Sequence, residues 1–140
     1  MRYRQIAVIT LVLILSSGVL SFSGTVAFTL DCGGFNSLPE PRLRYPISET
    51  AILTGSGPLE FQWWNDVVGI RGFTIKIYKG YNMYAVDLIH KEELPAGAYS
   101  VKIKPDLFED GHVYTWSLVQ VSNAGYKSDS SFNSFKVIKK

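Results

Sequence analysis

Four side chains that could hold a metal ion or transfer a proton lie within seven residues of one another: Asp106, Glu109, Asp110 and His112. Oxygen ligands suit hard cations, so these residues could form a calcium site or a site for another metal. Their spacing does not match the calcium loop of a helix-loop-helix hand. Asp110 followed by Gly111 is instead typical of a turn that precedes a strand. We therefore predict a turn at this point and no metal ligands.

The other patterns with catalytic potential also fail the requirements of a site. Gly55-Ser56-Gly57 lacks the strand–turn–helix context of a serine elbow, which predicts a loop. Glu92 and Glu93 could act as a catalytic pair of carboxylates, but they are adjacent, so on a strand they would face opposite ways and could not flank one substrate bond. We predict a solvated turn for them instead. His90, like His112, has no partner at metal-ligand spacing, which predicts a surface position. No glycine-rich phosphate loop precedes a helix, so we predict no catalytic residue and no cofactor.

The aromatic residues, 14% of the chain, are the remaining lead on function. Alternation along predicted strands places Trp63 and Trp116 in the core, as it does Phe73 and Phe135. Five further aromatic residues fall on the opposite parity or in loops: Trp64, Tyr78, Tyr81, Tyr84 and Tyr126. Exposed aromatic rings can stack on sugar rings or anchor a protein partner. They can also simply cover the surface of a sheet, since Tyr and Trp bury their rings while their polar tips stay wet.

The elements that position these residues have a period of two. Apolar and polar residues alternate over five predicted strands, at residues 59–64, 73–78, 99–104, 114–119 and 134–138. Less clear strands cover residues 51–54 and 84–89. Turn residues such as Asn123-Ala124-Gly125 separate the runs. About seven short strands with regular turns predict an all-β, antiparallel sandwich.

Residues from about Pro46 to Lys140 resemble a fibronectin type III-like module of the immunoglobulin-like sandwiches. The resemblance starts with Leu59-Glu-Phe-Gln-Trp63 and Phe73-Thr-Ile-Lys-Ile-Tyr78. Its most telling stretch is Leu107-Phe-Glu-Asp-Gly-His-Val-Tyr114-Thr-Trp-Ser-Leu118. The resemblance implies that Tyr114 forms the tyrosine corner, in which the hydroxyl bonds a backbone group a few residues upstream. It specifies a fold and leaves the ligand open.

Residues 1–27 read as an export signal or as an N-terminal anchor helix. Two arginines precede an aliphatic run from Ile6 to Leu15, and small residues follow. Cleavage after Ser23 or Ala27 fits the preference for small side chains. The uncharged stretch from Ile6 to Leu30 could instead remain as a membrane anchor. Lipidation of Cys32 is a third alternative, although Thr29-Leu30-Asp31 matches the required box poorly.

Residues 28–45, rich in Gly and Pro, are predicted to be a linker, and residues 46–140 the sandwich domain. The chain has 140 residues, 14 of them basic and 12 acidic, so its net charge is +2. Loss of Arg2 and Arg4 with the signal leaves 12 basic and 12 acidic residues. The remaining chain then has no net charge, which makes nucleic acid a poor partner. A single cysteine excludes a disulfide framework.

These features together predict a secreted or periplasmic binding module without catalytic activity, either free or anchored to the membrane by its N-terminal segment. Its expected partner is a protein or a component of the cell surface. The first alternative is a carbohydrate-binding module that uses the exposed aromatic rings. The second is a small metal-dependent or hydrolytic enzyme built on the loops.

Overall fold

The computed structural model describes residues 8–13, 22–27, 38–47 and 50–140. The chain divides into two compact units, Met1–Phe35 and Asn36–Lys140. In the first unit, β1 (Val8–Leu13) pairs antiparallel with β2 (Phe22–Ala27), with Val8 opposite Ala27. The expected N-terminal helix is therefore not found in these two segments, where the run Val-Ile-Thr-Leu-Val-Leu is rich in β-branched residues. The other residues of the predicted signal, and Cys32, lie outside the described residues.

No helix in the described part of the chain is long and apolar enough to cross a membrane.

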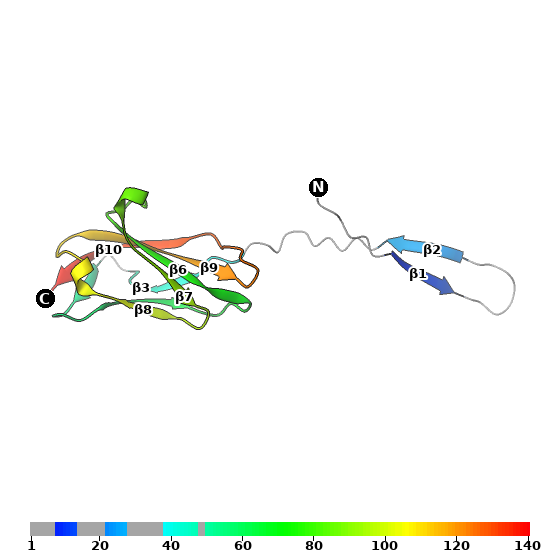
Figure 1. Ribbon diagram of the computed structural model, residues 1–140, viewed down its shortest axis with the longest axis horizontal. Coiled ribbons are helices and arrows are strands. Elements are labelled where there is room, and N and C mark those ends of the chain that lie inside the picture. Colours follow the sequence, from blue (N-terminus) through cyan, green and yellow to red (C-terminus); the bar gives the residue numbers. More distant parts are fainter. Residues whose placement is uncertain (1–7, 14–21, 28–37, 48–49) are drawn as a thin grey trace. The chain divides into compact units, whose positions relative to one another are not determined.

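The second unit is a sandwich of two sheets (Figure 1). Three strands form the smaller sheet in the order β3 (Arg42–Tyr45), β5 (Leu59–Trp64) and β8 (Ser100–Ile103). Five strands form the larger sheet in the order β4 (Thr50–Leu53), β10 (Ser131–Lys139), β9 (Val113–Ser122), β6 (Ile70–Lys79) and β7 (Leu88–Pro95). Only the pair formed by β4 and β10 is parallel among these strands. The predicted antiparallel β-sandwich is confirmed.

Three segments of the second unit differ from the sequence-based prediction. Residues 42–45, expected in the linker, form β3, in which Leu43 lies opposite Trp63 of β5. The short strand forms because Leu43 and Tyr45 pack against the core while the flanking arginines face water.

The predicted strand over 84–89 is wrong for residues 84–87, and only Leu88 and Ile89 belong to a strand, β7 (Leu88–Pro95); the predicted turn at Glu92 and Glu93 is also wrong. The 3₁₀ turn η1 (Ala85–Asp87) comes first, and both glutamates lie in β7. They pair opposite Ile75 and Thr74 of β6, which supplies the hydrogen-bond partners that a turn would lack.

Inward residues of both sheets form one core, as the alternation predicts. Trp63 and Trp116 are both buried, and the ring of Phe61 lies 5.1 Å from that of Trp116 in an edge-on arrangement. The indole N–H of Trp116 donates to the backbone carbonyl of Pro46 at 2.8 Å, so its polar atom is satisfied inside the core. Together these contacts join the first residues of the sandwich to its centre.

Tyr114 closes the end of the sandwich next to η2 (Pro105–Leu107). Its buried ring meets Phe108 edge-on at 5.1 Å, and its hydroxyl accepts a hydrogen bond of 2.8 Å from the backbone N–H of Glu109. This is the contact that the resemblance implies for a tyrosine corner. It holds the loop between β8 and β9 against the core.

Replacement of Tyr114 by Phe leaves the partly buried N–H of Glu109 without its acceptor. We expect the free energy of unfolding to fall by about 1–3 kcal/mol, measured by urea denaturation followed by tryptophan fluorescence. Tyr99→Phe is the matched control because Tyr99 is exposed, and its change should stay within about 0.5 kcal/mol. Equal losses in both variants would contradict the role of the corner.

Candidate functional site

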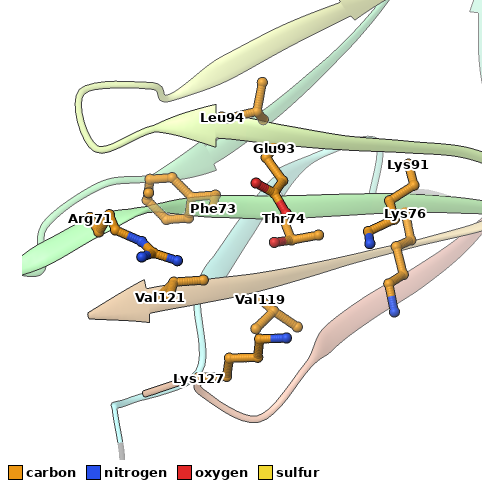
Figure 2. Close-up of a pocket in the computed structure, with 11 residues that line it drawn as sticks. Arg71, Phe73, Thr74, Lys76, Lys91, Glu93, Leu94, Val119, Val121 and Lys127 are labelled. Carbon is orange, nitrogen blue, oxygen red and sulfur yellow. The ribbon is translucent and has the colours of Figure 1, made fainter. Parts of the chain in front are cut away.

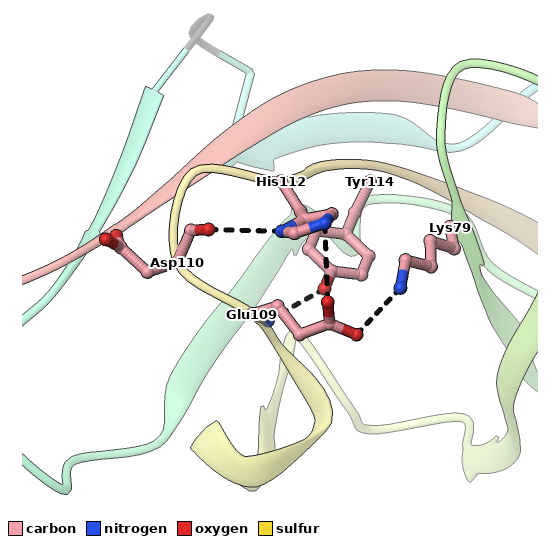
Figure 3. A network of polar contacts seen from close by, with 5 residues as sticks. All are labelled: Lys79, Glu109, Asp110, His112 and Tyr114. Carbon is pink, nitrogen blue, oxygen red and sulfur yellow. Dashed lines mark hydrogen bonds and ion pairs between the residues drawn. The ribbon is translucent and has the colours of Figure 1, made fainter.

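The cluster of acidic residues and histidine serves as structural support (Figure 3). The Lys79 ammonium donates to the Glu109 carboxylate at 2.7 Å, and His112 Nε2 lies 3.3 Å from the other oxygen of Glu109. The Asp110 carboxylate accepts from the backbone N–H of Lys139 at 2.8 Å. Asp110 and Gly111 form the predicted turn. No group of three or more potential metal ligands occurs among the described residues.

The ion pair between Lys79 and Glu109 shifts the pKa of both partners in the sense expected for an attraction. The hydrogen bond from Lys79 holds the pKa of the Glu109 carboxyl below its ordinary value. The same bond raises the pKa of the Lys79 ammonium. The pair joins the end of β6 to the loop between β8 and β9, and both side chains remain largely exposed.

Glu109→Gln should lower the stability at neutral pH, where the carboxylate and the ammonium are both charged. Because the pKa of Glu109 is lowered by folding, the pair's contribution is present above the unfolded-state pKa and disappears as the pH falls through the folded-state value. The urea midpoints of the wild type and Glu109→Gln should therefore differ slightly at neutral pH and converge in acid. Asp106→Asn, an exposed change in the same loop, should show no such convergence. A pH-independent difference for Glu109→Gln would contradict this account.

The predicted binding aromatics do not form one platform. Trp64 and Tyr126 lie near the end of the sandwich where β6 begins. Trp64 is the last residue of β5, which precedes β6. Tyr126 accepts a backbone hydrogen bond from Ser122, which pairs with Ile70 at the start of β6. Tyr81 and Tyr84 follow the other end of β6.

Tyr78 has the predicted outward parity, but the expectation that it is exposed is wrong, since only 7% of its surface is accessible. It lies on the central strand β6, with β7 and β9 pairing along its two sides, so neighbouring side chains cover the ring.

The loop between β6 and β7 has a fixed base. The N–H of Gly80 donates to the carbonyl of Val113 at 2.7 Å, and the hydroxyl of Thr115 donates to the carbonyl of Gly80 at 2.7 Å. Gly80 has a φ of 89°, in the left-handed region that favours glycine. Inside the loop, the N–H of Asp87 donates to the carbonyl of Tyr84 at 3.0 Å and closes η1. These hydrogen bonds tie the base of the loop to β9 and close the turn at its tip.

The tip of this loop presents large apolar side chains to water. Tyr81 is 74% exposed, Tyr84 63% and Val86 90%, and Met83 and Leu88 are also exposed. In Figure 1 the short green turn η1 extends from the ends of β6 and β7. These five exposed apolar side chains follow one another closely along the chain, unlike apolar residues that are exposed singly. We call residues Tyr81–Leu88 the apolar loop.

Sequence reasoning selected Tyr81 and Tyr84 but missed the other three residues of the apolar loop. The segment Tyr84–Ile89 alternates well enough to resemble a strand, and that interpretation concealed its exposure. The usable signal was the preceding Gly80, because it marks the end of β6 and therefore the start of a connection.

Trp64 forms a second exposed cluster on the outer face of the smaller sheet. Its ring is 48% exposed, and the guanidinium groups of Arg42 and Arg44 lie over it at 5.8 and 5.1 Å from the centroid. Arg42 also pairs with Asp66 at 3.3 Å. Sequence reasoning missed both arginines because it placed them in a linker. Such stacking orders the ring and takes up part of the face that a sugar would use.

A shallow groove of about 610 Å³ runs beside Trp64. It is lined by Arg42 and Leu43 of β3 and by Phe132 and Asn133 of β10. Phe132 is exposed, so this edge of the sandwich combines two aromatic rings with cationic groups.

The geometry defines an immunoglobulin-like β-sandwich with a tyrosine corner. No family model matches the chain, and no curated protein matches it in sequence. Several solved structures similar to it are described as fibronectin type III or type III-like domains. The third fibronectin III domain of human KIAA0343 protein has 17% identity and a TM-score of 0.49, and the match covers 89% of this chain and 94% of that one.

Two further similar structures come from a bird and a bacterium. The FN1-FN3 domains of chicken CNTN1 have 13% identity and a TM-score of 0.49, over 68% of this chain and 29% of that one. The fibronectin(III)-like modules of Clostridium thermocellum CbhA have 12% identity and a TM-score of 0.44, over 71% of this chain and 96% of that one.

Proposed function

We propose that the sandwich is a non-catalytic interaction module that docks on a protein partner through the apolar loop. The observation that carries this proposal is the contiguous exposure of Tyr81, Met83, Tyr84, Val86 and Leu88 on a loop whose base is fixed by hydrogen bonds. Tyr and Met are enriched in the cores of protein interfaces. A loop that is already ordered loses little conformational entropy when a partner covers it.

The chemistry around the apolar loop favours a protein over an anionic membrane surface. Asp87 lies within the loop, and the nearest cation for which the structure gives a contact, Lys79, is engaged by Glu109. A membrane-binding loop would instead carry free lysines or arginines beside its apolar residues. Tyr81 and Tyr84 therefore serve as anchors of a protein contact.

A carbohydrate platform is less well supported by the geometry. The exposed aromatic rings lie at two ends of the sandwich, and arginines stack over Trp64. Trp64 and Tyr126, at the opposite end of β6, contribute little to a contact centred on the apolar loop.

A triple variant, Y81S/Y84S/V86S, tests the docking site. Affinity capture from secreted and surface fractions of the source organism, read by quantitative mass spectrometry, should lose the partner with this variant. Trp64→Ala is the matched control, because it removes an exposed aromatic ring at the other end, and it should retain the partner. With the purified partner, calorimetry should show a Kd weaker by about 30-fold or more in the triple variant.

Three results would contradict the proposal. One is loss of the partner with Trp64→Ala and retention with the triple variant. Another is equal retention by both variants. The third is a glycan-array signal of the wild type that only Trp64→Ala removes, together with no captured protein, which would favour the carbohydrate alternative.

We also propose that the module works outside the cytoplasm, secreted or periplasmic, after export by residues 1–27. The order of basic, aliphatic and small residues in this segment supports export. Mass spectrometry of the protein purified from its source should give a mature N-terminus at Gly24 or Phe28. An intact N-terminus in the membrane fraction would indicate the anchor alternative, and a lipid adduct on Cys32 would indicate lipidation. An intact chain in the cytoplasm would contradict export.

A further inference from the structure

A cationic groove crosses the outer face of the larger sheet, away from the apolar loop (Figure 2). Its volume is about 430 Å³, within the range of roughly 300–1,000 Å³ found for ligand sites. Residues of β6, β7 and β9 line it, together with Lys127 from the segment that follows β9. Val119 and Val121 of β9 supply an apolar floor, and Thr74 of β6 adds a hydroxyl.

Four cations surround this floor, and one carboxylate accompanies them. Lys76 of β6 lies directly opposite Lys91 of β7 in the strand register. Arg71 lies at the other end of the groove, as Figure 2 shows. The backbone of Lys127 pairs with that of Val121 in an isolated β-bridge. Glu93 is the only acidic residue that lines the groove.

These positive charges outnumber the single carboxylate of Glu93 in the lining of the groove. Among the described residues, no ion pair involves Arg71, Lys76, Lys91 or Lys127. Like charges directly opposite each other on neighbouring strands destabilise a sheet. The excess positive charge makes this face complementary to an anion.

The apolar floor narrows the class of anion. Nucleic acid and sugar ligands use exposed aromatic rings for stacking, but Phe73 is the only aromatic residue lining the groove and is buried. Two valines between two groups of cations suit a peptide that carries apolar side chains between carboxylates.

We propose that this groove binds an extended acidic peptide segment of a partner protein. Arg71 and Lys76 are five residues apart on β6, which is about 17 Å at the rise of an extended strand. A segment of about six extended residues therefore reaches from one cationic end to the other. Alternate side chains of an extended segment face the groove, so a carboxylate at one end faces Arg71 and Lys127, a central apolar side chain covers Val119 and Val121, and a carboxylate at the other end faces Lys76 and Lys91.

The cationic groove is separate from the apolar loop, the docking site of the proposed function. The apolar loop follows the end of β6 at Lys79, whereas the groove occupies the outer face of the sheet from Arg71 to Lys76. Variants of one surface leave the other intact, so the two proposals fail independently.

The test uses the full chain and a fluorescein-labelled hexapeptide with two glutamates at each end and two valines between them. Fluorescence polarisation should show saturable binding at low salt that weakens as salt is added. The variant K76Q/K91Q should bind the peptide about tenfold more weakly. The control K102Q/K104Q removes the same charge from exposed positions outside the groove and should bind as the wild type does. Thermal melting checks that both variants are folded.

Five outcomes would overturn the proposal. The wild type fails to bind the peptide, or K76Q/K91Q binds it as tightly as the wild type. The control loses as much affinity as K76Q/K91Q, which would mean unspecific attraction. A version of the peptide with glutamines in place of glutamates binds equally well, or a sulfated polysaccharide or single-stranded DNA binds while the peptide does not.

Discussion

The central strand β6 is the constraint on which the rest of the structure depends. Its ten residues pair with β9 on one side and with β7 on the other, so neither edge is free. Strict alternation then assigns Phe73, Ile75 and Ile77 to the core and Thr74 and Lys76 to the outer face. A shift of one residue would bury a lysine and expose the core. The same strand therefore sets the packing, the charge of one face and the position of the apolar loop.

Much of this fold can be predicted from local sequence. Inward aromatic residues such as Trp63, Phe73 and Trp116 repeat at period two in central strands, where burial of one face is strong. Tyr114 was predictable because its role depends on a short segment with a turn and a particular residue type. Peripheral strands were harder. β3 is short and preceded by prolines, and β7 lies at an edge where both faces are partly wet, so its polar residues resemble a turn.

The proposed binding surfaces depend on relations that no local pattern contains. Lys76 and Lys91 meet only because of the register between β6 and β7, and Arg42 meets Trp64 only because β3 pairs with β5. Exposure is also a property of the whole fold. Tyr78 and Tyr81 are three residues apart and of one type, yet the first is covered by its neighbours and the second faces water.

The position of β7 at the edge of the larger sheet has a consequence for self-association. An edge strand offers a row of unpaired backbone groups to which a second copy of the chain could add its own strand. Lys91 lies near the middle of this edge, and Pro95 ends the row without an N–H to donate, and both are residue types that hinder the addition of a further strand. Lys91, which costs the sheet some stability where it lies opposite Lys76, thus also protects the edge from edge-to-edge aggregation.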